Sequence, residues 1–476
     1  MSKRSCLAFA LVLALSMALP LWGCNQSKDA TQVQTTTQDQ TTESAEATEQ
    51  QADVKEEQAT QEFYKPGDAY TLQQVVVLSR HNIRAPLSTT GSALDQATPH
   101  TWIDWTANAS ELTMRGGALE TMMGQYMRKW LESEGLIPQN YQPEEGAVRF
   151  YANGKQRTIA TAQYFSSGML PVANVDIETH ADYDAMDPVF SPSFTFMSDA
   201  YAEAAMAEIA QKGDGTSVAS VAADLADSYA LVQDVVDYKE SDAYKLGTIK
   251  DLDTTDTKIT LELGQEPAVE GSLKTACQLA DALVLQYYES PDATAAAFGH
   301  ELTDEQWGLV AKSKDAYIDI LYTAPLVAHN IAHPLLQEIG NEMDAQGRKF
   351  TFLCGHDSNV ASVLAALGVE EYELPGAIEA DTPIGGKLVF ERWADADGNE
   401  YGRVRLLYQS VSQLREGTML SGTESPMSVD FSFEGMQKNE DGLYSYDDLR
   451  ARIADSVAEY DRIVEEYDEV ELAQAA

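Results

Sequence analysis

Two largely apolar runs stand out in the hydrophobic pattern of the chain, at residues 75–78 and 350–354. Short runs rich in β-branched and aromatic residues are typical of strands buried on both faces of a parallel sheet. By periodicity alone, the first run would also fit a short buried helix. Polar residues follow each run directly, at 79–84 and 356–359. Because ligands of open α/β sheets bind past the carboxyl ends of strands, the pattern predicts a functional site there.

Helical periodicity follows the first polar segment, and a second strand and helix come after it. Residues 148–151 predict a strand, 153–154 a turn and 156–166 a helix. This order places Arg157 at the start of a helix that follows a strand, where backbone donors and a guanidinium can face one anion. The alternative is a surface arginine in a first turn. Four apolar residues share one face of the preceding helix: Leu119, Met123, Tyr126 and Trp130.

The strand signal fades between 187 and 323, where helical patterns dominate. The clearest are 218–238, 273–288 and a helix capped by Thr303. The fold class predicted is therefore α/β, with an α-helical lobe at 187–323 inserted into a catalytic core formed by 63–186 and 324–476. Within the second part of that core we expect strands at 387–392 and 403–408 and a closing helix at 445–467.

The acidic balance of the chain is extreme, with 76 Asp and Glu against 32 Lys and Arg and a formal charge of −44. Such a charge argues against nucleic acid and against an anionic membrane surface as partners. An anionic small molecule must then be bound by a local cluster of arginines. The hydrophobic fraction of 44% suits a globular protein, and 476 residues predict two packed units rather than one core.

The amino-terminal region has the pattern of a bacterial export signal. A basic start precedes an apolar run over 7–21, which is too short for a transmembrane span. The run ends in Leu-Trp-Gly-Cys, which looks like a lipobox, so Cys24 would be lipidated after a signal peptide over 1–23 is removed. Trp22 departs from the usual small residue, and a plain cleaved signal or an uncleaved anchor stays open. Residues 24–62 predict a disordered acidic linker, which places the folded part outside the cytoplasm, in the periplasm or at the cell surface.

The chain also contains two cysteines and a pair of histidines that could form a disulfide or bind a metal. Nothing in the sequence brings Cys277 and Cys354 together, so we predict two buried free thiols. His329 and His333 have the spacing of a zinc pair, but such a pair without a third ligand is more often packing. We predict no metal and no cofactor.

The first polar segment carries groups suited to a phosphate. Arg80 and Arg84 each offer a planar fork of donors and a permanent charge, which match the oxygens of a phosphate monoester. A neutral His81 between them can attack phosphorus and split one displacement into two easier ones through a phosphohistidine. The plainer interpretation is a basic loop capped by Pro86, and the residues alone favour it.

Residues 80–86 read R-H-N-I-R-A-P and resemble the R-H-G-x-R-x-P signature of the histidine acid phosphatase family. Asn82 stands where most members have Gly, and this form is similar to the bacterial glucose-1-phosphatase branch. Further motifs match in the same order between about 72 and 414: GQYMR at 124–128, YAN at 151–153, QRT at 156–158, QEP at 265–267, GHDSN at 355–359 and TPIGGK at 382–387.

This resemblance implies a phosphoglycerate-mutase-like α/β core with an inserted α-helical lobe. It implies that His81 is the nucleophile and Asp357 the proton donor of a metal-free hydrolase. The phosphoryl oxygens would be held by Arg80, Arg84, Arg157 and His356. Glu266 matches a glutamate at the pocket mouth of relatives. Without the resemblance, Asp357 would be a helix cap and Glu266 a solvated loop acid.

The resemblance implies a small phosphorylated substrate, glucose 1-phosphate or a related sugar phosphate. An inositol phosphate hydrolase of phytase type stays open. A different class also stays open, a tethered lipoprotein that binds a sugar phosphate without cleaving it. A nucleophile and an acid beside the arginines favour the enzyme, and the membrane would be a partner through the lipid anchor only.

Overall fold

The computed structural model describes residues 65–88 and 92–475, with side chains as far as Asp468. These residues belong to one compact unit. The predicted signal peptide, Cys24 and the predicted linker lie outside the described residues. The division of the folded part into a core and a lobe, with the boundaries given above, stays a prediction.

A seven-stranded mixed sheet runs through the structure, in the order β2-β5-β1-β6-β7-β8, with β9 paired to β7. The central strand β1 (Thr71–Arg80) is parallel to β5 (Phe350–Gly355) and antiparallel to β6 (Lys387–Ala394). Both apolar runs are therefore confirmed as strands. The other strands are β2 (Val148–Ala152), β7 (Glu400–Tyr408), β8 (Met427–Asp430) and β9 (Tyr444–Ser445).

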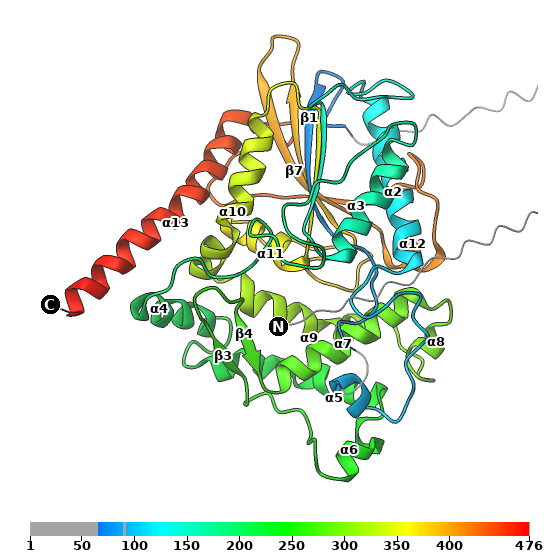
Figure 1. Cartoon of the computed structure of the whole chain (residues 1–476), viewed down its shortest axis with the longest axis vertical. Helices are drawn as coiled ribbons and strands as arrows, with labels where there is room; N and C mark the ends of the chain where they lie inside the picture. Colours follow the sequence, from blue (N-terminus) through cyan, green and yellow to red (C-terminus); the bar gives the residue numbers. More distant parts are fainter. Residues whose placement is uncertain (1–64, 89–91, 476) are drawn as a thin grey trace, which may run out of the picture. The chain divides into compact units, whose positions relative to one another are not determined.

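Residues 75–78 in the middle of β1 are apolar without alternation because helices cover both faces of the sheet (Figure 1). Val75 and Val77 pack into a core with α2 (Met114–Ser133) and α3 (Gln156–Met169). Val76 and Leu78 point the other way, into a core shared with three helices. These are α10 (Pro325–Asp344), α11 (Asp357–Ala366) and α13 (Tyr446–Ala475). The predicted helical face of α2 is confirmed, since all four of its apolar residues are buried.

The segment between Asp199 and Tyr322 is mainly helical, as predicted. Its longest helices are α4 (Asp199–Ala210), α7 (Ser272–Glu289) and α9 (Asp304–Tyr322), and Thr303 caps α9 through a capping box as expected. The short elements are α5 (Ala226–Val235), α6 (Asp242–Lys245), α8 (Ala293–Ala296), the 3₁₀ helices η1 (Val218–Leu225) and η2 (Tyr238–Glu240), and the ribbon β3 (Lys258–Thr260) with β4 (Ala268–Glu270). Outside this segment lie the short helices α1 (Ala93–Gln96) and α12 (Val411–Glu416).

The helical pattern predicted over 218–238 is confirmed, but the segment is not one regular helix. It begins with the 3₁₀ helix η1, continues as α5 and breaks at Asp237, whose φ is 50°. A residue in the left-handed conformation cannot continue a right-handed helix, which explains the break.

Cys277 and Cys354 are both free thiols, as predicted. Cys354 is buried, but Cys277 is only partly buried, so the prediction of two buried thiols was wrong for Cys277. On α10, a ring nitrogen of His329 bonds Ser456 O at 3.3 Å and one of His333 bonds Asn330 O at 2.8 Å. Both histidines are therefore engaged in packing the helix. Within the described part of the chain, no helix is long and apolar enough to cross a bilayer.

Candidate active site

The three parallel strands bring the predicted polar segments together. Arg80 at the end of β1 pairs with Gly355 of β5, and Ala152 of β2 pairs with Cys354. The backbone N–H of His81 donates to Gly355 O at 3.1 Å. Loops that are far apart in sequence therefore begin side by side at the carboxyl edge of the sheet, where the sequence predicted a site.

A cavity of about 330 Å³ opens at this edge. It is lined by six of the seven predicted catalytic and substrate-binding residues: His81, Arg84, Arg157, Glu266, His356 and Asp357. The seventh, Arg80, does not line it. The remaining wall comes from helices α7 and α9 and from the segments around Leu87 and Met186. The sheet edge thus supplies one side of the cavity and the helical segment the other.

His81 is held in one tautomer by the backbone of the next residue in its loop. Its Nδ1 lies 2.8 Å from the carbonyl oxygen of Asn82, which can only accept, so Nδ1 carries the proton and Nε2 has the lone pair. Burial, the positive charge of Arg157, and the proximity of His356 and Arg84 hold the pKa of His81 well below its usual value. The imidazole therefore favours its neutral form, which is the form that a nucleophile needs.

His356 is held by Asn153, a residue of the matched YAN motif for which no role was predicted. Asn153 Oδ1 accepts the backbone N–H of Asp187 at 2.9 Å, so its Nδ2 donates to His356 Nε2 at 2.7 Å. The proton of His356 then lies on Nδ1, 3.4 Å from Nη2 of Arg157. Nδ1 of His356 and Nη2 of Arg157 are thus two adjacent donors, which suit an anionic oxygen that accepts from both.

Positive charge is concentrated on the sheet side of the cavity. Arg157 forms no ion pair with a carboxylate in the described part of the chain, and burial together with Arg84 lowers its pKa to about 10. Arg84 pairs with Asp281 of α7 at 2.9 Å. Because both guanidinium groups remain charged and lie near each other, this side of the cavity favours an anion.

Arg80 lies behind the residues that line the cavity and is 1% exposed. Its Nη2 lies 3.1 Å from Oδ2 of Asp357, and its Nη1 donates to Thr382 O and lies 3.7 Å from Glu379. Burial raises the pKa of Asp357, but Arg80 and Lys314 outweigh it and bring that pKa well below its usual value. Without a bound substrate, Asp357 is therefore an ionised partner of Arg80.

The wall formed by the helices was not predicted from the sequence. On α7, Lys274, Cys277, Gln278 and Asp281 line the cavity at helical spacing, and on α9 Lys314 and Tyr317 do so. Lys314 is 3% exposed, and its Nζ has no hydrogen-bond partner among the described residues. Polar residues at i, i+3, i+4 and i+7 on an otherwise buried helix were the available signal.

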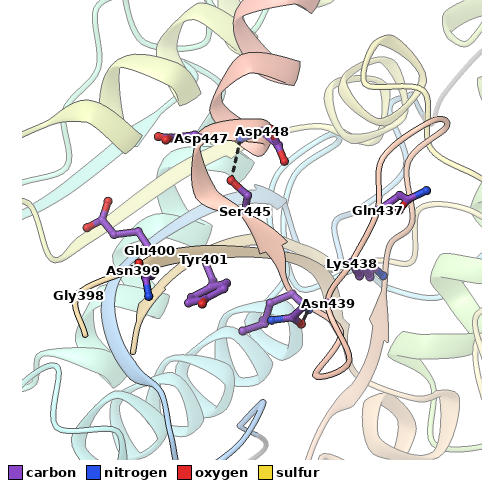
Figure 2. A pocket seen from close by; sticks show the side chains of 11 residues that line it. Gly398, Asn399, Glu400, Tyr401, Gln437, Lys438, Asn439, Ser445, Asp447 and Asp448 are labelled. Atoms are coloured by element: carbon purple, nitrogen blue, oxygen red, sulfur yellow. Dashed lines mark hydrogen bonds between the residues drawn. The ribbon is translucent and has the colours of Figure 1, made fainter. Parts of the chain in front are cut away.

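A second hollow, of about 720 Å³, is lined by residues that include Tyr401, Ser445 and Asp448 (Figure 2). It lies at the end of the sheet opposite the cavity. Tyr401 on its wall pairs with Trp393, which pairs with Leu72 near the start of β1. Glu400, Asp447 and Asp448 give it carboxylates, and none of the predicted site residues lines it. The chemistry predicted from the sequence therefore belongs to the smaller cavity.

A neutral imidazole, two charged guanidinium groups and a carboxylate around one cavity are the groups that suit phosphoryl transfer. A family model described as histidine phosphatase superfamily (branch 2) matches residues 71–409. The chain belongs to this superfamily, and it is an acid phosphatase with the α/β histidine phosphatase fold.

Known relatives agree with this assignment. The chain is 38% identical to a glucose-1-phosphatase of Salmonella typhimurium over 385 residues, which cover 80% of this chain and 91% of the relative. It is 28% identical to the phytase AppA of Escherichia coli, covering 79% and 89%. The solved structure of Hafnia alvei phytase superposes with a TM-score of 0.74 at 28% identity, covering 82% and 98%.

Proposed function

We propose that the chain hydrolyses sugar phosphates, with glucose 1-phosphate among its preferred substrates, through a phosphohistidine at His81. The observation that carries this proposal is the arrangement around one cavity of a neutral His81, the donors of Arg84, Arg157 and His356, and the carboxyl of Asp357. In the first step Nε2 of His81 forms a bond to phosphorus as the ester P–O bond breaks, and the leaving oxygen takes a proton from Asp357. Water then attacks phosphorus, gives a proton to Asp357, and the P–N bond breaks.

The acid role of Asp357 requires a change on substrate binding. A bound phosphate dianion would compete with Asp357 for the positive charge of Arg80, which stabilises the carboxylate in the free enzyme. It would also place additional negative charge close to Asp357. Both effects raise the pKa of Asp357. Arg80 then contributes to phosphate binding from behind the cavity wall, which reconciles its buried position with the predicted role.

The leaving-group side of the cavity supports a small sugar over a polyphosphate. About 330 Å³ lies at the lower end of the range for ligand sites. Lys274 and Lys314 on this side are balanced by Glu266 and Asp281, and Tyr317 adds an aromatic wall. A nearly neutral, partly aromatic surface suits hydroxyl groups and a sugar face better than further phosphates.

Release of inorganic phosphate from glucose 1-phosphate, glucose 6-phosphate and phytate, with and without chelator, tests this function. We expect glucose 1-phosphate to give the highest kcat/KM, unaffected by chelator. His81→Ala should remove turnover almost wholly while inorganic phosphate still binds. Turnover by His81→Ala comparable to that of the wild type would contradict the mechanism, and loss of activity in chelator would contradict a metal-free reaction.

Phytate is the second candidate substrate. Solved structures that resemble this chain include Hafnia alvei phytase in complex with myo-inositol hexakis sulphate, at 28% identity and a TM-score of 0.73. A higher kcat/KM for phytate than for glucose 1-phosphate in the same assay would favour this alternative.

We further propose that the enzyme works outside the cytoplasm, in the periplasm or at the cell surface, and is held there by a lipid on Cys24. The lipobox-like sequence and the acidic, aromatic-free composition of residues 25–62 support this proposal.

A further inference from the structure

Asn82 follows the proposed nucleophile directly and is 1% exposed. Its backbone N–H donates to Thr161 Oγ1 at 3.2 Å, its Oδ1 accepts the N–H of Ile83 at 2.8 Å, and its Nδ2 donates to Glu120 Oε1 at 2.8 Å. Its carbonyl oxygen accepts from Nδ1 of His81 at 2.8 Å. All the polar atoms of Asn82 therefore have partners, and one partner is the imidazole of His81.

The partner of the Asn82 amide belongs to a buried ion pair that the proposed mechanism does not use. Glu120 on α2 and Lys387 at the start of β6 are both 0% exposed, with Nζ 2.8 Å from Oε1. Lys387 also donates to Gly385 O at 2.7 Å, and the N–H of Gly385 donates to His81 O at 3.1 Å. Polar contacts thus form a closed ring from the backbone of His81 through Gly385, Lys387 and Glu120 to Asn82.

The space for the amide is made by a residue without a side chain. Gly385 has φ +65°, and a Cβ there would collide with Nδ2 of Asn82. A substituted residue would be strained at this φ and would displace the amide from Glu120. Asn82 and Gly385 therefore fit each other, and the amide of Asn82 has one position.

We propose that Asn82 is a positioning residue for His81, with the ion pair of Glu120 and Lys387 as the fixed support that holds its amide. The backbone carbonyl and the side chain of Asn82 belong to one residue, so a fixed side chain limits how far the carbonyl can rotate. Anchoring the side chain therefore keeps the backbone carbonyl of Asn82 on Nδ1 of His81, and this keeps the lone pair of Nε2 directed toward the cavity. This inference rests on the proposed function, in which Nε2 attacks phosphorus.

The first test measures the burst of p-nitrophenol from p-nitrophenyl phosphate in Asn82→Gly and Asn82→Ser, which both lose the contact with Glu120. Small errors in the orientation of a nucleophile are costly, so we expect the burst rate to fall by about 10–100-fold. Inhibition by inorganic phosphate should stay close to that of the wild type, because Arg84 and Arg157 are untouched. Glu120→Gln keeps an acceptor for Asn82 and should retain the burst rate.

Asn330→Ala is the matched control for a purely structural effect. Asn330 is 0% exposed on α10, accepts the N–H of Thr195 at 3.0 Å and donates to Phe196 O at 2.9 Å. Its replacement removes these hydrogen bonds, and a third from Thr195 Oγ1 at 3.4 Å, at a site away from the cavity. We expect it to lower the melting temperature and to leave the burst rate unchanged.

A spectroscopic measurement reports the positioning directly. In protein labelled with ¹⁵N-histidine, His81 should carry its proton on Nδ1 in the wild type and should populate both tautomers in Asn82→Ser. A wild-type burst rate and a single Nδ1–H tautomer in both Asn82 variants would overturn the role of Asn82, as would an equal loss in Asn330→Ala. A burst that persists in His81→Ala would instead overturn the proposed function.

Discussion

Replacing Asp357 by asparagine should strengthen phosphate binding and weaken the cleavage of sugar phosphates at the same time. Oδ2 of Asp357 lies 3.1 Å from Nη2 of Arg80, and the side chains are 21% and 1% exposed. Asparagine keeps the shape and removes the charge and the proton. Arg80 retains its bond to Thr382 O and its proximity to Glu379, so the guanidinium is not left without a partner and the fold should persist.

The two effects have different sizes. At about 5 Å and an effective dielectric constant of about 20, a unit charge on phosphate and one on the carboxylate repel by about 3 kcal/mol. Solvent at the cavity mouth screens part of this repulsion, so we expect inorganic phosphate to bind about tenfold more tightly to Asp357→Asn. A general acid contributes about 10²–10⁴-fold where the leaving group needs a proton. The sugar oxygen of glucose 1-phosphate needs one far more than p-nitrophenolate does.

Single-turnover phosphorylation with both substrates, together with the inhibition constant for phosphate, measures these effects. Asp281→Asn is the matched control, because Asp281 is a second cavity carboxylate that pairs with an arginine, Arg84, at 2.9 Å. It should tighten phosphate binding without discriminating between the two leaving groups. Equal losses of phosphorylation rate for both substrates in Asp357→Asn would refute the acid role and leave Asp357 as a positioning or capping residue.

Three further predictions concern other parts of the chain. Glu266→Gly should raise activity on phytate relative to glucose 1-phosphate by removing repulsion at the cavity mouth, and Glu266→Gln should recover only the salt-sensitive part; unchanged substrate ratios would make Glu266 a solvated surface acid. Cys24→Ser should move active enzyme from the membrane fraction to the soluble extracytoplasmic fraction, and an unmoved enzyme would argue against lipidation. Burial raises the pKa of Asp315 to about 7 in the folded protein. Between the pKa of this group in the unfolded chain and pH 7, the folded state therefore binds more protons than the unfolded state. The resulting contribution to stability is lost as the pH rises through 7. Urea unfolding should therefore show a fall in stability from pH 4 to pH 7 that is smaller in Asp315→Asn; identical slopes would rule out this titration.

The strands that carry the site could be predicted because an apolar run buried on both faces leaves a clear signal. His81 and Arg84 after β1, and His356 and Asp357 after β5, line the cavity. The buried position of Arg80 could not be predicted, because its partners Asp357, Glu379 and Thr382 are all distant in sequence. Glu379, for example, lies 3.7 Å from its guanidinium and almost 300 positions away in sequence.

The wall of the cavity illustrates a different limit. Lys314 and Tyr317 line it from α9, and Asp281 does so from α7. Each helix also buries apolar residues, so its sequence shows an ordinary packed helix. The helical spacing of the polar residues on α7 marks one face of that helix, but it does not say what that face contacts. Which polar residues line the cavity is decided by how the two helices pack against the rest of the structure.

The first strand of the sheet is also its centre, and this has a consequence for how the polypeptide matures. Val75 pairs with Phe350 on one edge of β1, and Val77 pairs with Val389 on the other. Neither edge of β1 can therefore be paired before those residues have been synthesised. Contacts this distant in sequence close slowly, and an unpaired apolar strand is open to wrong pairing in the meantime. The emerging amino-terminal part therefore cannot complete its sheet while synthesis continues. Such a delay keeps the polypeptide unfolded, as export through a membrane requires. A chain that left the ribosome without being exported would need a chaperone to cover β1.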